Sequence, residues 1–330
     1  MTSRERVRAA ITFAGPDRVP VSLPGEWGND ILRVRFDSDP GFNPGREGED
    51  EWGCVWQKVS ASDKTKGQVR GHPLTDFTQL SSMRTPDYKC PARNKQMTSD
   101  IQANNLSENP KFVIANNPAS LCHLPEYLRG TINAWTDPFE NPEDYRKLLD
   151  IITRTGDDAV DRCAETGGVD AIILYDDWGL QDRPIFSPDL FDEFIKPMYA
   201  RLFKRAHDHG LFTVLHSCGH ITALLDSMIE TGLDVIQMDQ QENMGMDNLA
   251  RSFGGRIAFW CPVDIQKTMI DGTVRDVEEY ARKLIDNFGR FNGGFIADWY
   301  AAPDAVGHSW EKINAMCRAF TGHGGAGVLR

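Results

Sequence analysis

A histidine and a cysteine two positions apart carry the strongest chemical signal in the sequence. His216 and Cys218 lie in the segment TVLHSCGH at 213–220, where an apolar run ends. Side chains alternate along a strand, so residues 216 and 218 point to the same side. Imidazole nitrogen and thiolate sulfur are usual zinc ligands, and a catalytic zinc site has three protein ligands and an open position. The pair therefore predicts two ligands of a zinc centre.

The third ligand must come from another segment of the chain. Cys261 is the first choice, because it directly follows the apolar run 256–260 and should reach the same rim. A carboxylate is the alternative, since four of them end or follow an apolar run: Glu26, Asp176, Asp177 and Asp298. Adjacent strand residues point in opposite directions, so only one of the pair Asp176 and Asp177 faces the site.

Two carboxylates are also candidates for catalysis, namely Asp177 and Glu26. Each has the chemistry to hold the proton of a leaving group or to complete a metal shell. Aromatic side chains crowd the same strand ends, where they predict an apolar substrate pocket for a flat, weakly polar ligand. They are Trp27, Trp178, Trp260, Trp299 and Tyr300.

These residues share one rim only if the runs before them form parallel strands around one sheet. Apolar runs alternate with helical patterns from about residue 108 onward, and 19–23 adds a first strand. The expected strands are 111–116, 169–175, 211–216, 233–238, 256–260 and 294–297, and the expected helices are 142–165, 188–209, 221–231, 274–288 and 311–320. Alternation of this kind predicts a single (β/α)8 TIM-type barrel, whose strands end at the catalytic face.

Residues 35–107 break this rhythm with many Gly, Pro, Asp and Lys residues. We expect an irregular insertion after the first strand, with a small hairpin near residues 52–59 and a covering loop. The whole chain, 1–330, is then one barrel domain with this insertion.

Composition narrows the class of partner. The 330 residues are 40% hydrophobic and 25% charged with a net charge of -12, which is typical of a globular enzyme and unfavourable for binding nucleic acid. No apolar run reaches the ~18 residues of a membrane span, and the N-terminal segment lacks the features of a secretory signal. Seven scattered cysteines do not suggest a disulfide framework. We expect a cytoplasmic protein that acts on a small molecule.

The sequence resembles the uroporphyrinogen decarboxylase superfamily, which includes cobalamin-dependent methyltransferases. The resemblance rests on Arg4-Glu5-Arg6, Asp17-Arg18-Val19-Pro20, YDDWG at 175–179, HSCGH at 216–220 and FWCPVDIQKT at 259–268. True decarboxylases bind tetrapyrrole carboxylates with an RQAGR motif on the first strand. Here residues 23–28 read LPGEWG, with no arginine until Arg33. The resemblance therefore favours the methyltransferase branch.

That branch binds zinc with an H-x-C pair and a later third ligand. In the methylcobamide:thiol methyltransferases a cysteine follows the last strand, but residues 295–301 read FIADWYA, so Cys261 or Asp298 would replace it. The resemblance implies methyl transfer between a small methylated substrate, a methoxylated aromatic favoured, and the cobalt of a corrinoid. No cobalamin-binding sequence of the Asp-x-His-x-x-Gly kind is present, so a separate corrinoid protein is the expected partner.

Two other functions stay open at this point. One is a metal-independent decarboxylase of the uroporphyrinogen decarboxylase type, and the other is a non-catalytic protein that binds a corrinoid or tetrapyrrole. The sequence also leaves open whether two barrels pair into a homodimer.

Overall fold

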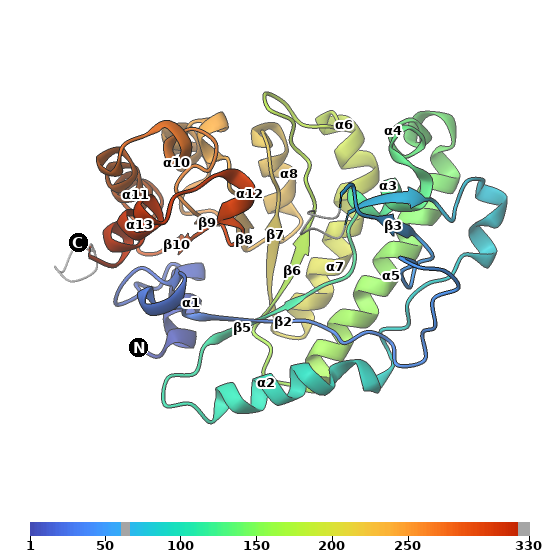
Figure 1. Ribbon diagram of the computed structural model, residues 1–330, viewed down its shortest axis with the longest axis horizontal. Coiled ribbons are helices and arrows are strands. Elements are labelled where there is room, and N and C mark those ends of the chain that lie inside the picture. Colours follow the sequence, from blue (N-terminus) through green and yellow to red (C-terminus); the bar gives the residue numbers. More distant parts are fainter. Residues whose placement is uncertain (61–66, 323–330) are drawn as a thin grey trace.

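Eight parallel strands form one sheet that is nearly closed into a barrel (Figure 1). The computed structural model describes residues 1–60 and 67–322. Around the sheet the order is β1-β10-β9-β8-β7-β6-β5-β2, and neighbouring strands pair in parallel. The strands are β1 Val21–Ser22, β2 Ile31–Val34, β5 Phe112–Asn116, β6 Ala171–Tyr175, β7 Phe212–His216, β8 Val235–Gln237, β9 Ala258–Cys261 and β10 Phe295–Asp298. The predicted TIM-type barrel is confirmed.

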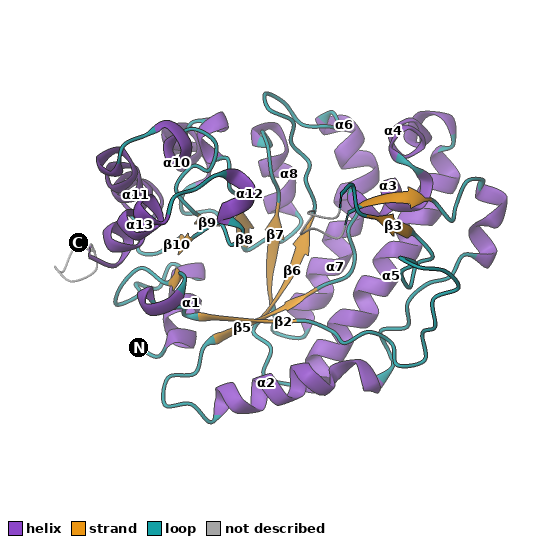
Figure 2. Cartoon of the chain, in the orientation of Figure 1, coloured by secondary structure: helices purple, strands orange, loops and turns teal. Residues whose placement is uncertain are grey.

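Helices surround this sheet, as the secondary-structure colouring in Figure 2 shows. A π-helical segment, Phe191–Ile195, joins α6 to α7. The helices are α1 Ser3–Ile11, α2 Lys95–Asn105, α3 His123–Arg129, α4 Thr131–Glu140, α5 Pro142–Thr166, α6 Pro188–Leu190, α7 Lys196–Asp208, α8 Leu225–Glu230, α9 Met246–Phe253, α10 Thr268–Asp271, α11 Val274–Phe288, α12 Pro303–Val306 and α13 Trp310–Gly322.

The strands bury apolar side chains on both faces, which explains their nearly continuous apolar runs. Ile173, Val214 and Val235 belong to a buried cluster that fills the barrel lumen. Their neighbours Leu174 and Leu215 belong to the larger cluster between strands and helices. Helix α1 adds Val7 and Ile11 to the lumen cluster at the amino-terminal end of the strands. In the described part of the chain, α1 thus covers the amino-terminal end of the lumen cluster.

A buried carboxylate joins the two ends of the sheet. Between β1 and β2 the chain makes a single 3-10 turn, Gly25–Trp27, and Asp30 follows it at 1% exposure. The amide of Asp30 donates to the carbonyl of Val21 on β1, and its carbonyl accepts from the amide of Phe112 on β5. Its carboxylate binds Arg6 at 3.0 Å and Arg18 at 2.7 Å. Asp30 therefore links both sheet edges to α1 and to the segment before β1.

Most of the predicted elements are present, but several others were not predicted, among them strand β2 and the helices α1, α3, α4 and α9. Strand β2 was not predicted, because its four residues, ILRV, alternate weakly and follow a turn of only a few residues. The segment 35–107 follows the second barrel strand, β2, and not the first as predicted. It contains a regular helix, α2, and the antiparallel pair β3 Val55–Gln57 and β4 Gln68–Gly71. The predicted hairpin near 52–59 thus contributes β3, whereas its partner strand lies further along the chain. Residues 61–66 of the insertion lie outside the described residues.

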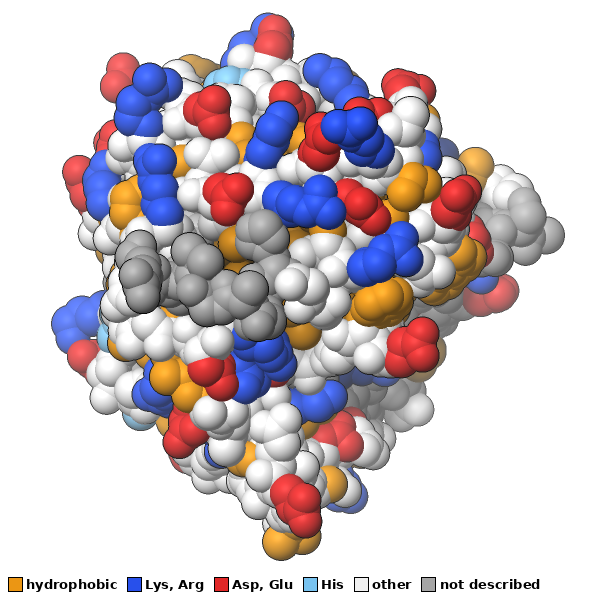
Figure 3. All heavy atoms as spheres, turned by 90° about the vertical axis from the view of Figure 1, so that its left-hand side faces the viewer, with side chains coloured by type: hydrophobic (Ala, Val, Ile, Leu, Met, Phe, Trp, Pro, Cys, Tyr) orange, Lys and Arg blue, Asp and Glu red, His pale blue; other side chains and the backbone are white. Residues whose placement is uncertain are grey.

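None of the helices in the described ranges combines the length and apolarity needed to cross a membrane. On the face that carries the C-terminal helices, acidic and basic side chains are interspersed (Figure 3). The net charge of -12 is therefore not gathered into one acidic patch on this face.

Replacing Asp30 tests how strongly barrel closure depends on its carboxylate. We expect Asp30→Ala to lower the free energy of unfolding by about 3–5 kcal/mol, because Arg6 and Arg18 lose a buried counter-charge. Asp182→Ala is the control, since the ion pair of Asp182 with Arg183 is largely exposed and should contribute less than about 1 kcal/mol. Urea unfolding of the three proteins measures both values. Equal stabilities would show that closure does not depend on this carboxylate.

Candidate metal centre

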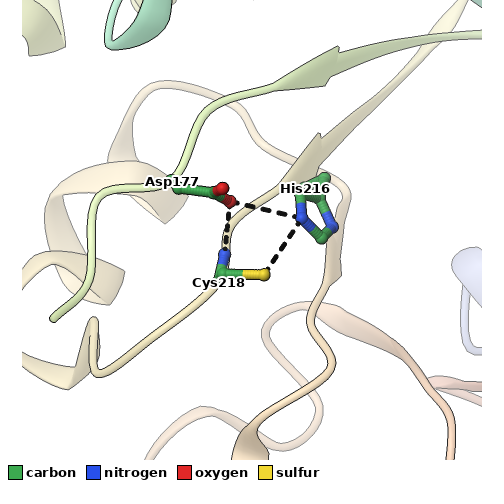
Figure 4. A group of neighbouring side chains, drawn as sticks. All are labelled: Asp177, His216 and Cys218. Atoms are coloured by element: carbon green, nitrogen blue, oxygen red, sulfur yellow. Dashed lines mark hydrogen bonds and ion pairs between the residues drawn. The ribbon is translucent and has the colours of Figure 1, made fainter. Parts of the chain in front are cut away.

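Three side chains from two neighbouring strands meet at the carboxyl end of the barrel (Figure 4). They are Asp177 just after β6, His216 at the end of β7 and Cys218 two residues later, and we call them the metal cluster. Nε2 of His216 lies 3.3 Å from Oδ1 of Asp177 and 3.4 Å from Sγ of Cys218. Among the described residues this is the one group of three or more potential metal ligands within such reach of one another.

The spacing of these atoms suits a tetrahedral metal. Zinc bonds of about 2.0–2.3 Å at tetrahedral angles place neighbouring ligand atoms roughly 3.4–3.6 Å apart. The distances of 3.3 and 3.4 Å around Nε2 are close to those values. The donor set of nitrogen, sulfur and carboxylate oxygen is also one that zinc accepts. The metal cluster therefore fits a three-ligand zinc site.

Hydrogen bonds behind the cluster orient the imidazole. Gln237, on the adjacent strand β8, accepts at its Oε1 from Nδ1 of His216 and donates from Nε2 to Asp239 at 2.8 Å. Because the amide oxygen can only accept, Nδ1 carries the proton of this hydrogen bond, and Nε2 is the ring nitrogen that faces Asp177 and Cys218. Such a second hydrogen bond is typical of histidines that bind metals.

The carboxylate of Asp177 is held in its ionised form. Burial works against ionisation, but His123 at 3.5 Å, His216 and the amide of Cys218 at 2.9 Å together keep the pKa of Asp177 well below its usual range. For His123 burial is again outweighed, and its pKa rises to about 10 through Asp177 and Glu126. An ionised Asp177 suits a metal ligand better than a proton donor.

The neighbouring carboxylate, Asp176, points the other way and is fully buried behind the sheet. It accepts hydrogen bonds from Ser120, from the amides of Leu121 and Cys122, and from the hydroxyl of Tyr199. The alternation of the strand thus assigns Asp176 to the outer layer and Asp177 to the site, as the sequence required of one of them.

The loops that carry Asp177 and Cys218 are in direct backbone contact. The amide of Gly179 donates to the carbonyl of Cys218 at 3.1 Å. Gly219 has a φ of +78°, and a Cβ there would lie 2.1 Å from the carbonyl oxygen of Gly179. Only glycine fits this approach, which holds the two ligand loops against each other.

The structure does not bring Cys261 to His216 and Cys218. Strand β9 continues through residue 261, so Cys261 points opposite to Trp260 and lies buried between the sheet and the helices. Asp298 ends β10 on the lumen side but belongs to a different group, 3.6 Å from Arg33. Glu26 is exposed on the 3-10 turn after β1. Asp177 is therefore the third potential ligand that the geometry offers.

Two of the five aromatic residues lie away from the barrel mouth. Trp178 is 1% exposed in the outer layer, where its Nε1 donates to the hydroxyl of Tyr199, because it alternates with the inward Asp177. Trp27 is partly buried against α13 and donates to Asn314. Neither position lines a pocket at the metal cluster.

The other three aromatic residues differ in position, since Trp299 packs against the larger cluster between strands and helices and not against the lumen cluster. Trp260 is fully buried in the lumen cluster. Trp299 is partly exposed, with its ring 6.1 Å from that of Trp310. Burial, Asp239 and Cys218 raise the pKa of Tyr300, so its hydroxyl lies within the electrostatic reach of the metal cluster.

A ring of polar side chains above the apolar lumen was missed by sequence analysis. It includes Arg33, Tyr175, Gln237 and Asp239, which lie at or beyond the carboxyl ends of strands. Tyr175 and Gln237 pair in register with His216, so strand alternation alone could have found them. Arg33 could not be found in this way because β2 itself was not predicted.

The acid Asp298 provides a pH-dependent test of this polar ring. Burial raises the pKa of Asp298 to about 7, and Asp239 adds to the effect against the opposing charge of Arg33. The native protein therefore keeps a proton that the unfolded chain releases near pH 3.8, and stability should fall as pH rises from about 4 to 7.

Replacing Asp298 by asparagine should remove this fall in stability with pH, because the amide does not ionise. We expect Asp298→Asn to gain roughly 1–4 kcal/mol over wild type at pH 8, with the difference shrinking toward zero near pH 4. Urea unfolding at several pH values measures it. A difference that does not change with pH would contradict the raised pKa.

Comparison with known proteins agrees with this architecture. The family model described as uroporphyrinogen decarboxylase (URO-D) matches residues 107–320. A methyltransferase from Methanosarcina mazei superposes with a TM-score of 0.67 at 17% identity, over 98% of this chain and 99% of that chain. Xylanase 10B from Thermotoga maritima gives a TM-score of 0.45 at 10% identity, over 98% of this chain and 99% of that chain. A search of curated protein sequences gave no match.

The family match spans about two thirds of the chain, from before β5 to the last turns of α13, and it includes the whole metal cluster. The structural match at 17% identity shows that the same fold extends over the N-terminal part as well. The chain belongs to the uroporphyrinogen decarboxylase family.

Proposed function

We propose that this protein is a zinc-dependent methyltransferase of the corrinoid type. It moves a methyl group between a small methylated substrate, for which a methoxylated aromatic is favoured, and the cobalt of a corrinoid on a partner protein. The single observation that carries the proposal is the metal cluster, because an imidazole, a thiol and an ionised carboxylate converge at the catalytic end of a barrel.

The residues of the metal cluster and their neighbours have different roles in binding a metal. His216, Cys218 and Asp177 would bind zinc and leave one position open toward the lumen mouth. Zinc supplies a Lewis acid that polarises the heteroatom carrying the methyl group. Gln237 accepts from Nδ1 of His216 and so leaves Nε2 as the nitrogen that would bind the metal, and His123 lies against the second oxygen of Asp177.

The proposed methyl transfer exchanges one bond for another. The bond between the methyl carbon and the substrate oxygen would break, the Co(I) of the partner's corrinoid would take up the methyl group, and the oxygen would leave as an anion that takes up a proton. The fold likeness to the Methanosarcina mazei methyltransferase supports this reading, as does the LPGEWG segment at 23–28, which contains no arginine to bind tetrapyrrole carboxylates.

Metal content is the first test of the proposal. We expect about one zinc per chain in protein purified without chelator, and loss of most of it in His216→Ala, Cys218→Ser and Asp177→Asn. Cys261→Ser should keep its zinc because that side chain faces away from the cluster. Cys90→Ser is a second cysteine control, because Cys90 lies in the segment 35–107 and belongs to neither the metal cluster nor β9. Elemental analysis gives the ratios.

Two outcomes would overturn parts of the proposal. Zinc-free wild type from a metal-replete preparation would remove the metal centre altogether. If zinc were lost in Cys261→Ser but kept in Asp177→Asn, Cys261 rather than Asp177 would be the third ligand.

Methyl transfer itself is tested with free cob(I)alamin as the acceptor. We expect methoxylated benzenes to convert it to methylcobalamin, which the visible spectrum reports, in wild type and in Cys90→Ser but not in Cys218→Ser. Full zinc occupancy without turnover of methoxylated substrates or methylamines would contradict the transferase and leave the metal site standing.

The role of Gln237 gives a separate prediction. Gln237→Ala removes the hydrogen bond that fixes the imidazole, so zinc affinity should fall about 10–100-fold. Competition with a chromogenic chelator measures the affinity. Gln237→Glu, which keeps an acceptor for Nδ1, should restore most of it, and equal losses in both variants would contradict a positioning role.

A further inference from the structure

Arg33 brings a positive charge into the polar ring of the barrel. Its guanidinium lies 4.8 Å above the ring of Trp260, with Nη1 3.3 Å from the hydroxyl of Tyr175 and Nη2 3.6 Å from Asp298. Its side chain is nevertheless 44% exposed, whereas that of Asp298 is 5% exposed. The stacked arginine is thus fixed in orientation and still open to a ligand.

Tyr175 connects this arginine to the metal cluster. The tyrosine ring lies 5.6 Å from the ring of His216, while its hydroxyl accepts from Arg33. One phenol side chain therefore spans the gap between a metal ligand and the guanidinium. A ligand of similar length lying alongside it would touch both.

Several groups around Arg33 could donate a hydrogen bond to a ligand. Nε1 of the fully buried Trp260 has no hydrogen-bond partner in the described part of the chain. Burial and the nearby Asp239 raise the pKa of Asp298 to about 7, so near neutral pH this acid is substantially protonated and offsets Arg33 only in part. An orphaned N–H group, a carboxylic acid and a partly uncompensated guanidinium all favour an acceptor ligand with negative charge.

We propose that Arg33, with Tyr175 and Asp298, forms a second subsite that binds the carboxylate of an aromatic acid whose methylated end reaches the metal cluster. This inference rests on the proposed function and narrows its substrate class to methoxylated aromatic carboxylates. The planar guanidinium matches a carboxylate in a bidentate manner, and the stacked Trp260 keeps that plane fixed.

Benzoate is the probe because it has the carboxylate and no methyl group. Isothermal titration at pH 7 should show benzoate binding to wild type, weakened about 10–100-fold in Arg33→Gln and partly restored in Arg33→Lys. Arg275→Gln is the matched control, since that arginine is 85% exposed on α11 and its loss removes the same charge far from the lumen. The affinity of Arg275→Gln for benzoate should equal that of wild type.

Asp298→Asn separates an anion site from a cation site. An anion site should keep or tighten benzoate when this acid becomes a neutral amide, whereas a cation site should bind 4-methoxybenzylamine and lose it in the same variant. Equal benzoate affinity in wild type and Arg33→Gln would overturn the subsite, as would binding of the amine alone. Zinc content and circular dichroism of each variant show that metal site and fold are intact.

Measurements of substrate turnover distinguish a failure of the carboxylate subsite from a failure of the proposed methyltransferase function. With cob(I)alamin as acceptor, 4-methoxybenzoate should be demethylated faster than 4-methoxybenzyl alcohol, through a lower KM that Arg33→Gln abolishes. Equal KM values for acid and alcohol would reject the carboxylate subsite and leave the methyltransferase intact. Benzoate binding that depends on Arg33, without turnover of any substrate, would support the subsite and reject the transferase.

Discussion

The barrel depends on a buried carboxylate, Asp30, that joins its two open edges. A sheet of parallel strands leaves unpaired amides and carbonyls at each end, and closure removes them. Here Asp30 contributes to closure through its backbone, which pairs with β1 and β5, and through its side chain, which binds two arginines. Those arginines belong to the segments Arg4-Glu5-Arg6 and Asp17-Arg18-Val19-Pro20. Part of the family resemblance therefore has a structural meaning, because it reports how the barrel is closed.

Closure in turn fixes where polar chemistry is allowed. Helix α1 and the apolar cluster fill the amino-terminal part of the lumen, so polar side chains gather at the carboxyl end of the strands. His216, Gln237 and Tyr175 lie there in register on three adjacent strands. Burial raises the pKa of Asp298, whereas hydrogen bonds from His123 and His216 lower the pKa of Asp177 against the effect of burial. The same ring thus holds one acid ionised and another partly protonated.

The sequence allowed much of this arrangement to be predicted, and the failures have physical reasons. Strand alternation correctly placed His216 and Cys218 together and allowed only one of Asp176 and Asp177 to join them. The same rule argues against Cys261, once β9 is known to run through residue 261. Strand ends cannot be read that finely from apolar runs. Arg33 was missed because tertiary pairing with β5, rather than local pattern, makes β2 a strand.

The contact between Gly179 and Gly219 has a consequence for the timing of metal capture. The two loops are already packed together, so Asp177 and Cys218 do not have to be gathered from separate flexible segments. Little conformational entropy then remains to be lost when an ion arrives, and the barrier to binding is mainly the removal of water from the ion. A side chain at either glycine would push the loops apart, because its Cβ would lie within 2.4 Å of backbone atoms of the other loop. The loops would then have to find the arrangement that brings Asp177 and Cys218 together before the ion could bind, and metal binding would become slower.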